Sequence, residues 1–256
     1  MTLALAAGSD QTLANRLRER AKLVVRGVLR RVDLDVSRGP YASRLARTMD
    51  ALGFDTLLDV GANVGQFGAL ARDAGFAGRI ISCEPLTGAY AQLRGRADRD
   101  GHWLAVHTAV GSEPGTTTIN VSANSFSSSV LTMTDEHLRS APGSGYIASE
   151  SVPLTTVTEL VAEHGIDPAR TLLKIDTQGY EAEVLAGAGA LIGEFGAVQL
   201  ELSFVELYAG QQLFDELYER MRRAGYHLHI IEPGFSDKSG RLMQCDGLFV
   251  RDDLSA

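Results

Sequence analysis

The stretch that decides the fold is TLLDVGANVGQFG, residues 56–68. A short apolar run reaches Asp59, passes into a glycine-rich turn and continues as a helical pattern, which is the strand-turn-helix order of a nucleotide-binding βα unit. We expect Gly61 to let the chain turn tightly off the strand, and Gly65 to leave room for a ligand at the start of the helix. The stretch therefore predicts a ligand site at this strand end.

The turn differs from two common phosphate-binding motifs. A P-loop has Lys followed by Ser or Thr after its last glycine, where this chain has Gln66 and Phe67. A dinucleotide fingerprint has G-x-G-x-x-G, where this chain has GANVG preceded by Asp59. A carboxylate in that place favours a ligand with positive charge and hydroxyl groups over one with a pyrophosphate.

A second acidic residue follows the next apolar run. Residues 79–83 (RIISC) lead into Glu84 and Pro85. An acid about 20 residues beyond the glycine turn is placed to accept hydrogen bonds from both ribose hydroxyls of a nucleoside. A glycine turn alone is often only a turn, and a glutamate at a strand end is often solvated. Together, at this spacing, the two features predict nucleoside binding.

Length and composition indicate a globular protein with one domain of ordinary size. With 256 residues, 45% hydrophobic and 22% charged, it can form one α/β domain plus an extra segment. The sequence has no apolar run of about 18 residues and no basic region before its first apolar residues, so we expect a cytoplasmic protein. Cys83 and Cys245 are expected to be reduced and buried. A net charge of -8 argues against a nucleic-acid partner.

Residues 1–52 are predicted to form an N-terminal helical cap, with helices over 11–32 and 41–52. The segment 16–31 is strongly basic and carries apolar residues at helical spacing. Two interpretations remain open for it. It is either a lid helix that packs one face on the core, or a peripheral contact with a membrane surface or a lipid-linked substrate.

Residues 53–256 are predicted to form an α/β domain, because strands and helices alternate. The last two strands are close enough in sequence to pair antiparallel. We therefore expect a seven-stranded, mostly parallel sheet with one antiparallel strand. The predicted strands are 56–60, 79–83, 104–109, 171–176, 197–202, 227–231 and 248–251, and the predicted helices are 66–74, 84–96, 156–164, 179–191 and 204–223.

An insertion over 112–154 interrupts this alternation. Residues 116–121 have the composition of a short edge strand, 122–150 form a long polar stretch, and 151–154 are expected to form another edge strand. Long structureless insertions are uncommon unless they are functional or disordered. We interpret this one as a substrate loop, with disorder as the alternative.

Four acids are predicted at strand ends: Asp59, Glu84, Asp176 and Glu201. Ligands of open α/β sheets bind beyond the carboxyl ends of the strands, so these acids should face one crevice. Their mutual repulsion would raise the pKa of some of them unless a cation is present. That cation would be the cofactor itself or a metal ion.

Several motifs together resemble the FkbM family of S-adenosylmethionine-dependent methyltransferases. They are DVGANVGQFG (59–68), EP (84–85), TAVGS (108–112), Asn124 with Ser128-Ser129, and LLKIDTQGYEAEVLAGA (172–188). The resemblance covers about residues 50–205, and the last block is its specific part. It implies a class I, Rossmann-like methyltransferase fold and O-methylation, commonly of sugar or polyketide hydroxyls. Gln178 stands where the family usually has Glu, so a role that needs a carboxylate there is in doubt.

The residues at the predicted strand ends fit the chemical groups of S-adenosylmethionine. The amino-acid end of the cofactor would meet Asp59, the backbone around Gly61 and the helix start, and Glu84 would bind the ribose diol. The full set is Asp59, Gly61, Ala62, Asn63, Gly65, Gln66, Phe67, Glu84, Pro85, Ala109 and Val110, of which the last two would line the adenine.

Asp176 is the predicted catalytic base, acting directly or through bound Mg²⁺, and Lys174 shares its strand face. Glu201 would complete the magnesium site with Asp176. The alternative is that Asp176 caps a helix and pairs with Lys174. His137 is an alternative base. The residues predicted to bind substrate or the polar tail of the cofactor, unless they form an ordinary polar loop, are Asn124, Ser128 and Ser129.

The sequence thus predicts an S-adenosylmethionine-dependent O-methyltransferase that acts on a hydroxyl of a sugar or of a glycosylated or lipid-linked metabolite. One alternative is a nicotinamide-dependent oxidoreductase, although the chain lacks its glycine motif and a Tyr-x-x-x-Lys pair. The other is a catalytically silent nucleoside-binding protein. The sequence defines neither the acceptor nor the oligomeric state, and a homo-oligomer stays open.

Overall fold

The computed structural model describes residues 41–254. The predicted helix over 11–32 and its basic segment lie outside the described residues. None of the helices within the described part is long and apolar enough to cross a membrane. The helices are α2 (Tyr41–Ala51), α3 (Gln66–Asp73), α4 (Thr87–Ala97), α5 (Asp135–Ser140), α6 (Val157–His164), α7 (Glu181–Ala188) and α8 (Phe214–Arg223), with short 3₁₀ helices at Pro142–Ser144, Pro168–Arg170, Gly189–Gly193 and Asp252–Leu254.

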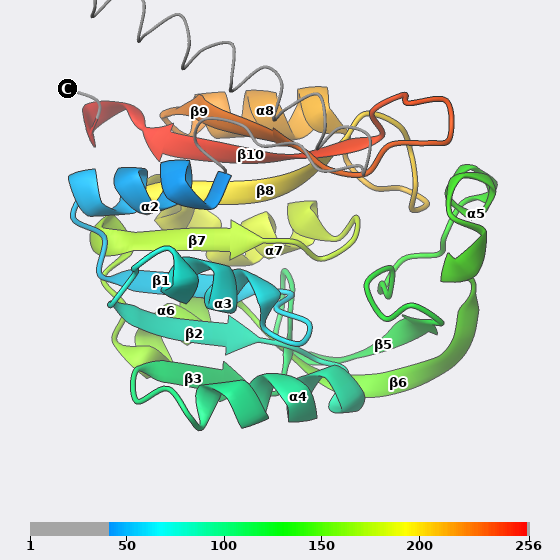
Figure 1. Cartoon of the computed structure of the whole chain (residues 1–256), viewed down its shortest axis with the longest axis horizontal. Coiled ribbons are helices and arrows are strands. Elements are labelled where there is room, and N and C mark those ends of the chain that lie inside the picture. Colours follow the sequence, from blue (N-terminus) through cyan, green and yellow to red (C-terminus); the bar gives the residue numbers. More distant parts are fainter. Residues whose placement is uncertain (1–40, 255–256) are drawn as a thin grey trace, which may run out of the picture. The chain divides into compact units, whose positions relative to one another are not determined.

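The main sheet has seven strands in the order β3-β2-β1-β7-β8-β10-β9 (Figure 1). Its pairs are parallel except that β10 runs antiparallel to both β8 and β9. The predicted fold class is therefore confirmed. The strands are β1 (Thr56–Val60), β2 (Arg79–Cys83), β3 (Trp103–Val106), β7 (Thr171–Ile175), β8 (Ala197–Ser203), β9 (Tyr226–Pro233) and β10 (Gln244–Arg251).

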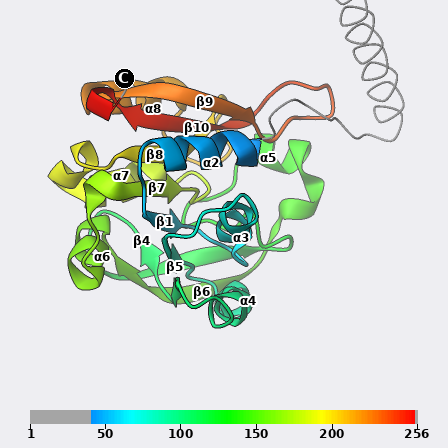
Figure 2. The same ribbon diagram turned by 60° about the vertical axis from the view of Figure 1, so that its left-hand side comes forward.

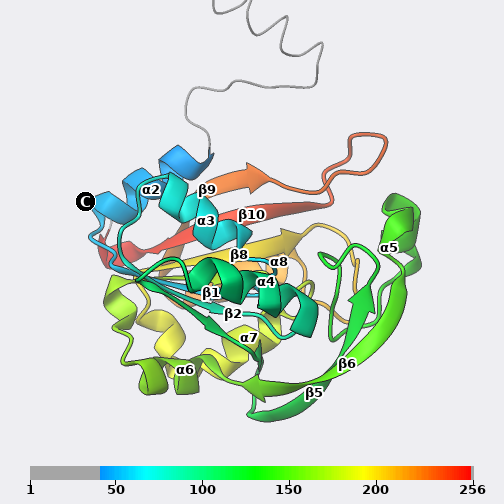
Figure 3. The ribbon, with the colours of Figure 1, turned by 60° about the horizontal axis from the view of Figure 1, so that its bottom comes forward.

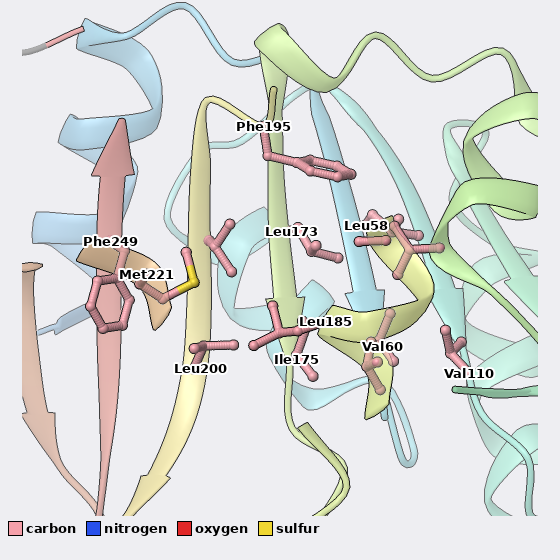
Figure 4. Packing of buried hydrophobic residues seen from close by; sticks show 14 of the residues in the cluster. Leu58, Val60, Val110, Leu173, Ile175, Leu185, Phe195, Leu200, Met221 and Phe249 are labelled. Atoms are coloured by element: carbon pink, nitrogen blue, oxygen red, sulfur yellow. The ribbon is translucent and has the colours of Figure 1, made fainter. Parts of the chain in front are cut away.

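The central strands are buried on both faces, as expected for parallel strands covered by helices. All five residues of β1 and all five of β7 are buried. On one face, Leu58 and Leu173 are paired across the sheet and pack against Leu185 of α7 in the main apolar core (Figure 4). Figure 2 shows the sheet between α6 and α7 on one side and α3 and α4 on the other. Each fully buried leucine stabilises the fold by about 1.5–3 kcal/mol.

A second sheet has three strands in the order β4-β6-β5, namely β4 (Ala109–Val110), β5 (Gly115–Ser122) and β6 (Tyr146–Thr155). Figure 3 shows β5 and β6 running side by side away from the main sheet, with α5 beyond their ends. The polar stretch 122–150, predicted as a structureless loop, instead contains α5 and half of β6. The strand predicted over 151–154 is the end of β6, which is central in this sheet and not an edge.

Three predicted elements need correction. The predicted helix over 204–223 begins only at Phe214, because the side chain of Gln211 closes a turn by accepting from the backbone N–H groups of Leu207 and Tyr208, at 2.8 and 2.6 Å. The predicted strand over 104–109 is split between β3 and β4, which belong to different sheets. The helix predicted over 179–191 is shorter, since α7 ends at Ala188 before Gly189, whose φ is +53°.

Candidate active site

A cavity of about 480 Å³ opens at the carboxyl ends of β1, β2, β7 and β8. That volume lies within the usual range for small-molecule sites. Predicted site residues that line it are Gly61, Ala62, Asn63, Gln66, Phe67, Glu84, Pro85, Ala109, Val110, Ser128, Ser129, Lys174, Asp176 and Glu201. Four predicted site residues are not part of the lining: Asp59, Gly65, Asn124 and His137.

The glycine turn is held tightly against its neighbours. Gly61 has a φ of +75°, and a Cβ there would collide with the backbone carbonyl of Asp176. The N–H groups of Gly61 and Ala62 both donate to the carbonyl of Cys83, at 3.1 and 3.0 Å. Gly65 has a different role from the predicted one: a Cβ there would meet the side chains of Leu93 and Trp103. It allows close packing against α4 and β3, and it does not line the cavity.

Asp59 lies beneath the cavity and is fully buried. Its carboxylate accepts from the hydroxyl of Ser82 at 3.1 Å and pairs with Lys174 at 3.0 Å. The predicted direct contact of Asp59 with the cofactor is therefore corrected, because its partners are other side chains of the sheet. The register explains the arrangement, since Asp59 lies between Ser82 on β2 and Lys174 on β7.

Lys174 joins the glycine turn to the acidic part of the cavity. Besides Asp59, its ammonium donates to the carbonyl of Gly61 at 3.0 Å and lies 3.6 Å from Asp176 and 5.6 Å from the ring centre of Phe67. Burial alone would lower the pKa of Lys174, but the carboxylates of Asp59 and Asp176 outweigh it and raise the pKa. Lys174 is therefore held between the carboxylate of Asp59 and the carbonyl of Gly61.

Glu84 lies just beyond the end of β2 and lines the cavity. One carboxylate oxygen accepts from the backbone N–H of Asn63 at 2.8 Å and the other from that of Leu86 at 2.9 Å. Burial raises the pKa of Glu84 to about 7, against the lowering effect of these two hydrogen bonds. The carboxylate is thereby held in one orientation beside the cavity.

The cavity has an apolar part next to Glu84. Several of its side chains belong to a small cluster between β4, β5 and α4. Phe126 extends this wall although its own side chain is 59% exposed. A flat, uncharged ring would fit such a surface. The apolar lining residues are Pro85, Leu86, Ala109, Val110, Ile119, Phe126 and Val130.

The opposite part of the cavity is acidic. Asp176, whose side chain is 34% exposed, lies close to Glu201 and Asp246. Burial, followed by repulsion from Asp176, raises the pKa of Glu201 well above its usual range and that of Asp246 to about 6. The amide of Gln178 bridges two of these groups, donating to Asp176 and to Glu201 at 2.9 Å each.

Sequence reasoning missed Gln178 as a bridge, and it missed Tyr180, Gln199 and Asp246, which also line the cavity. Asp246 enters from β10, the antiparallel strand, whose beginning rather than its end lies at this edge of the sheet. Its register opposite Glu201 becomes predictable only once β10 is paired with β8.

Three non-glycine residues with left-handed backbone, Asn63, Ser125 and Gln178, all line the cavity. Their φ angles are +48°, +58° and +56°. Such conformations are unfavourable for residues with a Cβ and tend to cluster at functional sites. The side chain of Asn63 donates to the carbonyl of Ser125 at 3.4 Å, which joins the glycine turn to the inserted segment.

The predicted substrate residues divide into two groups. Asn124 holds its own loop, accepting from the backbone N–H of Ser127 at 3.0 Å, and does not reach the cavity. Ser128 and Ser129 line the cavity, and the hydroxyl of Ser129 donates to the backbone carbonyl of Gln178 at 2.7 Å. The substrate role stays a prediction for these two serines.

His137 is not placed to act as a base. It is buried, its ring packs edge-on against Tyr208 and stacks on Phe235, and burial lowers its pKa. The side chain of Tyr208 lies between this pocket of aromatic residues and Gln178, to which its hydroxyl donates. The predicted alternative base is therefore replaced by a packing role.

The described residues also do not fit the predicted magnesium site. Within 41–254, no group of three or more His, Cys, Asp and Glu side chains is arranged to hold a metal ion. Asp176 and Glu201 do approach each other, but the amide nitrogen of Gln178 lies between them as a hydrogen-bond donor. Donors of this kind do not coordinate Mg²⁺, which binds oxygen ligands.

Comparison with known proteins matches the family described as Methyltransferase FkbM domain over residues 59–228. A search of curated proteins found no match. Among solved structures, an FkbM methyltransferase from Methylobacillus flagellatus is 16% identical with a TM-score of 0.47, and the match covers 77% of this chain but only 44% of that one.

Two further solved structures are similar over more of their length. Precorrin-6y C5,15-methyltransferase from Geobacter metallireducens is 11% identical with a TM-score of 0.42, over 82% of this chain and 87% of that one. The 1,6-didemethyltoxoflavin-N1-methyltransferase of Burkholderia thailandensis, solved with S-adenosylhomocysteine, is 15% identical with a TM-score of 0.41, over 98% and 93%.

Proposed function

This chain belongs to the FkbM methyltransferase family, and from that premise we propose that it is an S-adenosylmethionine-dependent O-methyltransferase that acts on a hydroxyl of a sugar or of a glycosylated or lipid-linked metabolite. One observation carries the proposal. A single cavity connects Glu84, beside an apolar wall, with Asp176 at its acidic part. When bound, S-adenosylmethionine supplies an electrophilic methyl group on a positively charged sulfur.

The residues around Glu84 fit the nucleoside half of such a molecule. Each oxygen of Glu84 already accepts one backbone N–H, and each keeps a further acceptor position for a ribose hydroxyl. The apolar wall that includes Ala109 and Val110 would hold the adenine ring. The backbone around Gly61 and the start of α3 at Gln66 would hold the amino-acid end.

Asp176 is the proposed general base. Its carboxylate lines the cavity and is partly exposed, so it can accept the proton of an acceptor hydroxyl within hydrogen-bond reach. The Lys174 ammonium lies 3.6 Å from one carboxylate oxygen of Asp176, and the amide of Gln178 donates to the other. Because Gln178 and Lys174 hold Asp176 from two sides, the base is oriented before the acceptor arrives, which supports alignment for an in-line displacement.

Calorimetric titration tests the cofactor part of the proposal. We expect S-adenosylhomocysteine to bind and NAD not to bind. The reverse result would support the nicotinamide alternative, and binding without turnover of any acceptor would support a silent nucleoside-binding protein.

A labelled methyl donor and a panel of monosaccharide and glycolipid acceptors test the chemical part. Asp176→Asn is expected to abolish methyl transfer and to leave binding of S-adenosylhomocysteine largely intact. The exposed change Asp135→Asn in α5 serves as the matched control. Turnover retained by Asp176→Asn would remove Asp176 from the mechanism.

A further inference from the structure

Gln178 is enclosed by partners on every polar atom of its side chain. The amide nitrogen donates both hydrogens to carboxylates, one to Asp176 and one to Glu201, each at 2.9 Å. The amide oxygen accepts from the hydroxyl of Tyr208 at 2.8 Å. Both amide hydrogens are thus engaged by the acids, so Gln178 acts on the site through the two acids that it joins.

The hydroxyl of the buried Tyr208 lies 2.8 Å from the amide oxygen of Gln178 and 3.3 Å from the carbonyl oxygen of Ser127. The shorter of these two contacts favours one orientation of the amide. In the flipped orientation, that oxygen would face Asp176 and Glu201, two acceptors, and would lose the Tyr208 donor. The observed orientation therefore follows from the hydrogen-bond network.

The backbone at Gln178 is held as firmly as its side chain. Gln178 has a φ of +56°, a conformation that persists only where the surroundings impose it. The buried carboxylate of Glu181 accepts from the N–H groups of Thr177 at 2.8 Å and Gly179 at 3.2 Å, on either side of Gln178. The hydroxyl of Ser129 donates to the carbonyl of Gln178 at 2.7 Å.

We propose that Gln178 takes the place of a divalent cation between Asp176 and Glu201, so that Gln178 positions the base and methyl transfer needs no metal ion. The amide hydrogens of Gln178 satisfy one oxygen of Asp176 and one of Glu201 without adding a full charge between the two acids. An ion could enter only if the amide turned its oxygen inward, which would break the hydrogen bond from Tyr208. The catalytic part of this proposal rests on the proposed function, whereas the metal-binding part does not.

Metal titration of the purified chain, after dialysis against EDTA, tests the first part. We expect no calorimetric signal for Mn²⁺ in the wild-type protein and the same methyl-transfer rate with EDTA as with Mg²⁺. Gln178→Glu places a third carboxylate between the other two and is expected to give a saturable Mn²⁺ binding signal that the wild type lacks. Gln92→Glu, on the exposed face of α4, adds the same charge elsewhere and should show no gain.

Gln178→Met tests the positioning role. The variant removes the donor between two carboxylates, so we expect kcat to fall, KM for the acceptor to stay unchanged, and the pH dependence of kcat to move to higher pH. A purely structural role would change the unfolding midpoint but leave the pH profile of the remaining activity as in wild type, and that result would contradict the proposal.

Several results would overturn the metal part. Wild-type activity lost in EDTA and restored by Mg²⁺ would do so, and so would Mn²⁺ binding to wild type that Asp176→Asn abolishes. A folded Gln178→Glu variant without Mn²⁺ affinity would also contradict it. If that variant does not fold, the wild-type titration and the EDTA assay decide the question. Titration of the same samples with S-adenosylhomocysteine reports on the proposed function separately.

Discussion

The ammonium of Lys174 lies 3.0 Å from a carboxylate oxygen of Asp59, and the two side chains are only 6% and 0% exposed. This pair connects β1 to β7 directly beneath the cavity, and Lys174 also holds the carbonyl of Gly61. A buried ion pair contributes less to stability than its distance suggests, but removal of one partner leaves a buried charge uncompensated.

Lys174→Met therefore tests how much this pair contributes to the stability of the fold. We expect the free energy of unfolding, measured by urea denaturation, to fall by about 3–5 kcal/mol, because the Asp59 carboxylate loses its cation. The double variant Lys174→Met with Asp59→Asn should regain a large part of that loss. Equal stabilities of the single and double variants would show that the two charges do not depend on each other.

Glu84→Gln tests the nucleoside end of the cavity. An amide in this place keeps one acceptor oxygen but turns an NH₂ group toward a backbone N–H, either that of Asn63 or that of Leu86. Hydrogen bonds to a charged acceptor are worth about 1.5–3 kcal/mol, so calorimetry should show at least about tenfold weaker binding of S-adenosylhomocysteine. Glu150→Gln, a change of a glutamate that accepts from Thr87 N–H outside the cavity, should bind as wild type does.

The ionisation of Glu84 predicts a pH dependence. Burial raises its pKa to about 7 in the folded chain, from an ordinary value of 4.5. Between pH 4.5 and about 7, the folded chain binds more protons at Glu84 than the unfolded chain does. Glu84 therefore makes the fold less stable as pH rises through this range.

Cofactor binding should follow the opposite trend. Ribose hydroxyls donate best to the ionised carboxylate, and the affinity for S-adenosylhomocysteine should rise from pH about 6 to about 8. An affinity that is flat over this range in wild type would contradict the role of Glu84.

The fold and part of this site could be predicted because they depend on local periodicity and on spacing. The glycine turn, Glu84 and Asp176 reach one cavity because parallel strands end at the same edge. The burial of Asp59 could not be predicted in the same way. It depends on Ser82 and Lys174, which become its neighbours only through strand pairing.

Other differences arise from tertiary contacts that local patterns do not contain. Asp246 reaches the cavity because its strand runs antiparallel, so its beginning lies where the other strands end. His137 lies in α5, where Tyr208 and Phe235 bury its ring. These partners are about 70 and 100 residues away in the sequence, and no local pattern indicates them.

Tyr208→Phe tests the orientation of the Gln178 amide. Loss of the hydroxyl removes the donor at 2.8 Å and lets the amide turn, so kcat should fall while S-adenosylhomocysteine binds as before. Tyr226→Phe is the matched control. It also removes a buried hydroxyl, one that lies next to the carbonyls of Ile192 and Phe195 at 2.6 Å, away from the cavity lining. We expect the control to lose about 1 kcal/mol of stability and no activity per folded molecule. Equal losses of kcat in the two variants would mean that the effect is general destabilisation.

Gly61→Ala tests how closely the glycine turn packs against the residues after β7. At Gly61 a Cβ meets both an unfavourable φ of +75° and the carbonyl of Asp176, whereas Gly75 has a φ of +99° and open space around its Cβ position. Gly75→Ala should therefore cost only the backbone strain, about 1–3 kcal/mol, and should leave cofactor affinity unchanged. Gly61→Ala should cost more, since overpacking typically adds about 1–3 kcal/mol, and it should also weaken binding of S-adenosylhomocysteine because the turn must move away from β7. Urea denaturation and calorimetry on both variants separate the cost of backbone strain from the cost of overpacking against Asp176. If Gly61→Ala matches Gly75→Ala in both measurements, the contact with Asp176 does not hold the glycine turn in place.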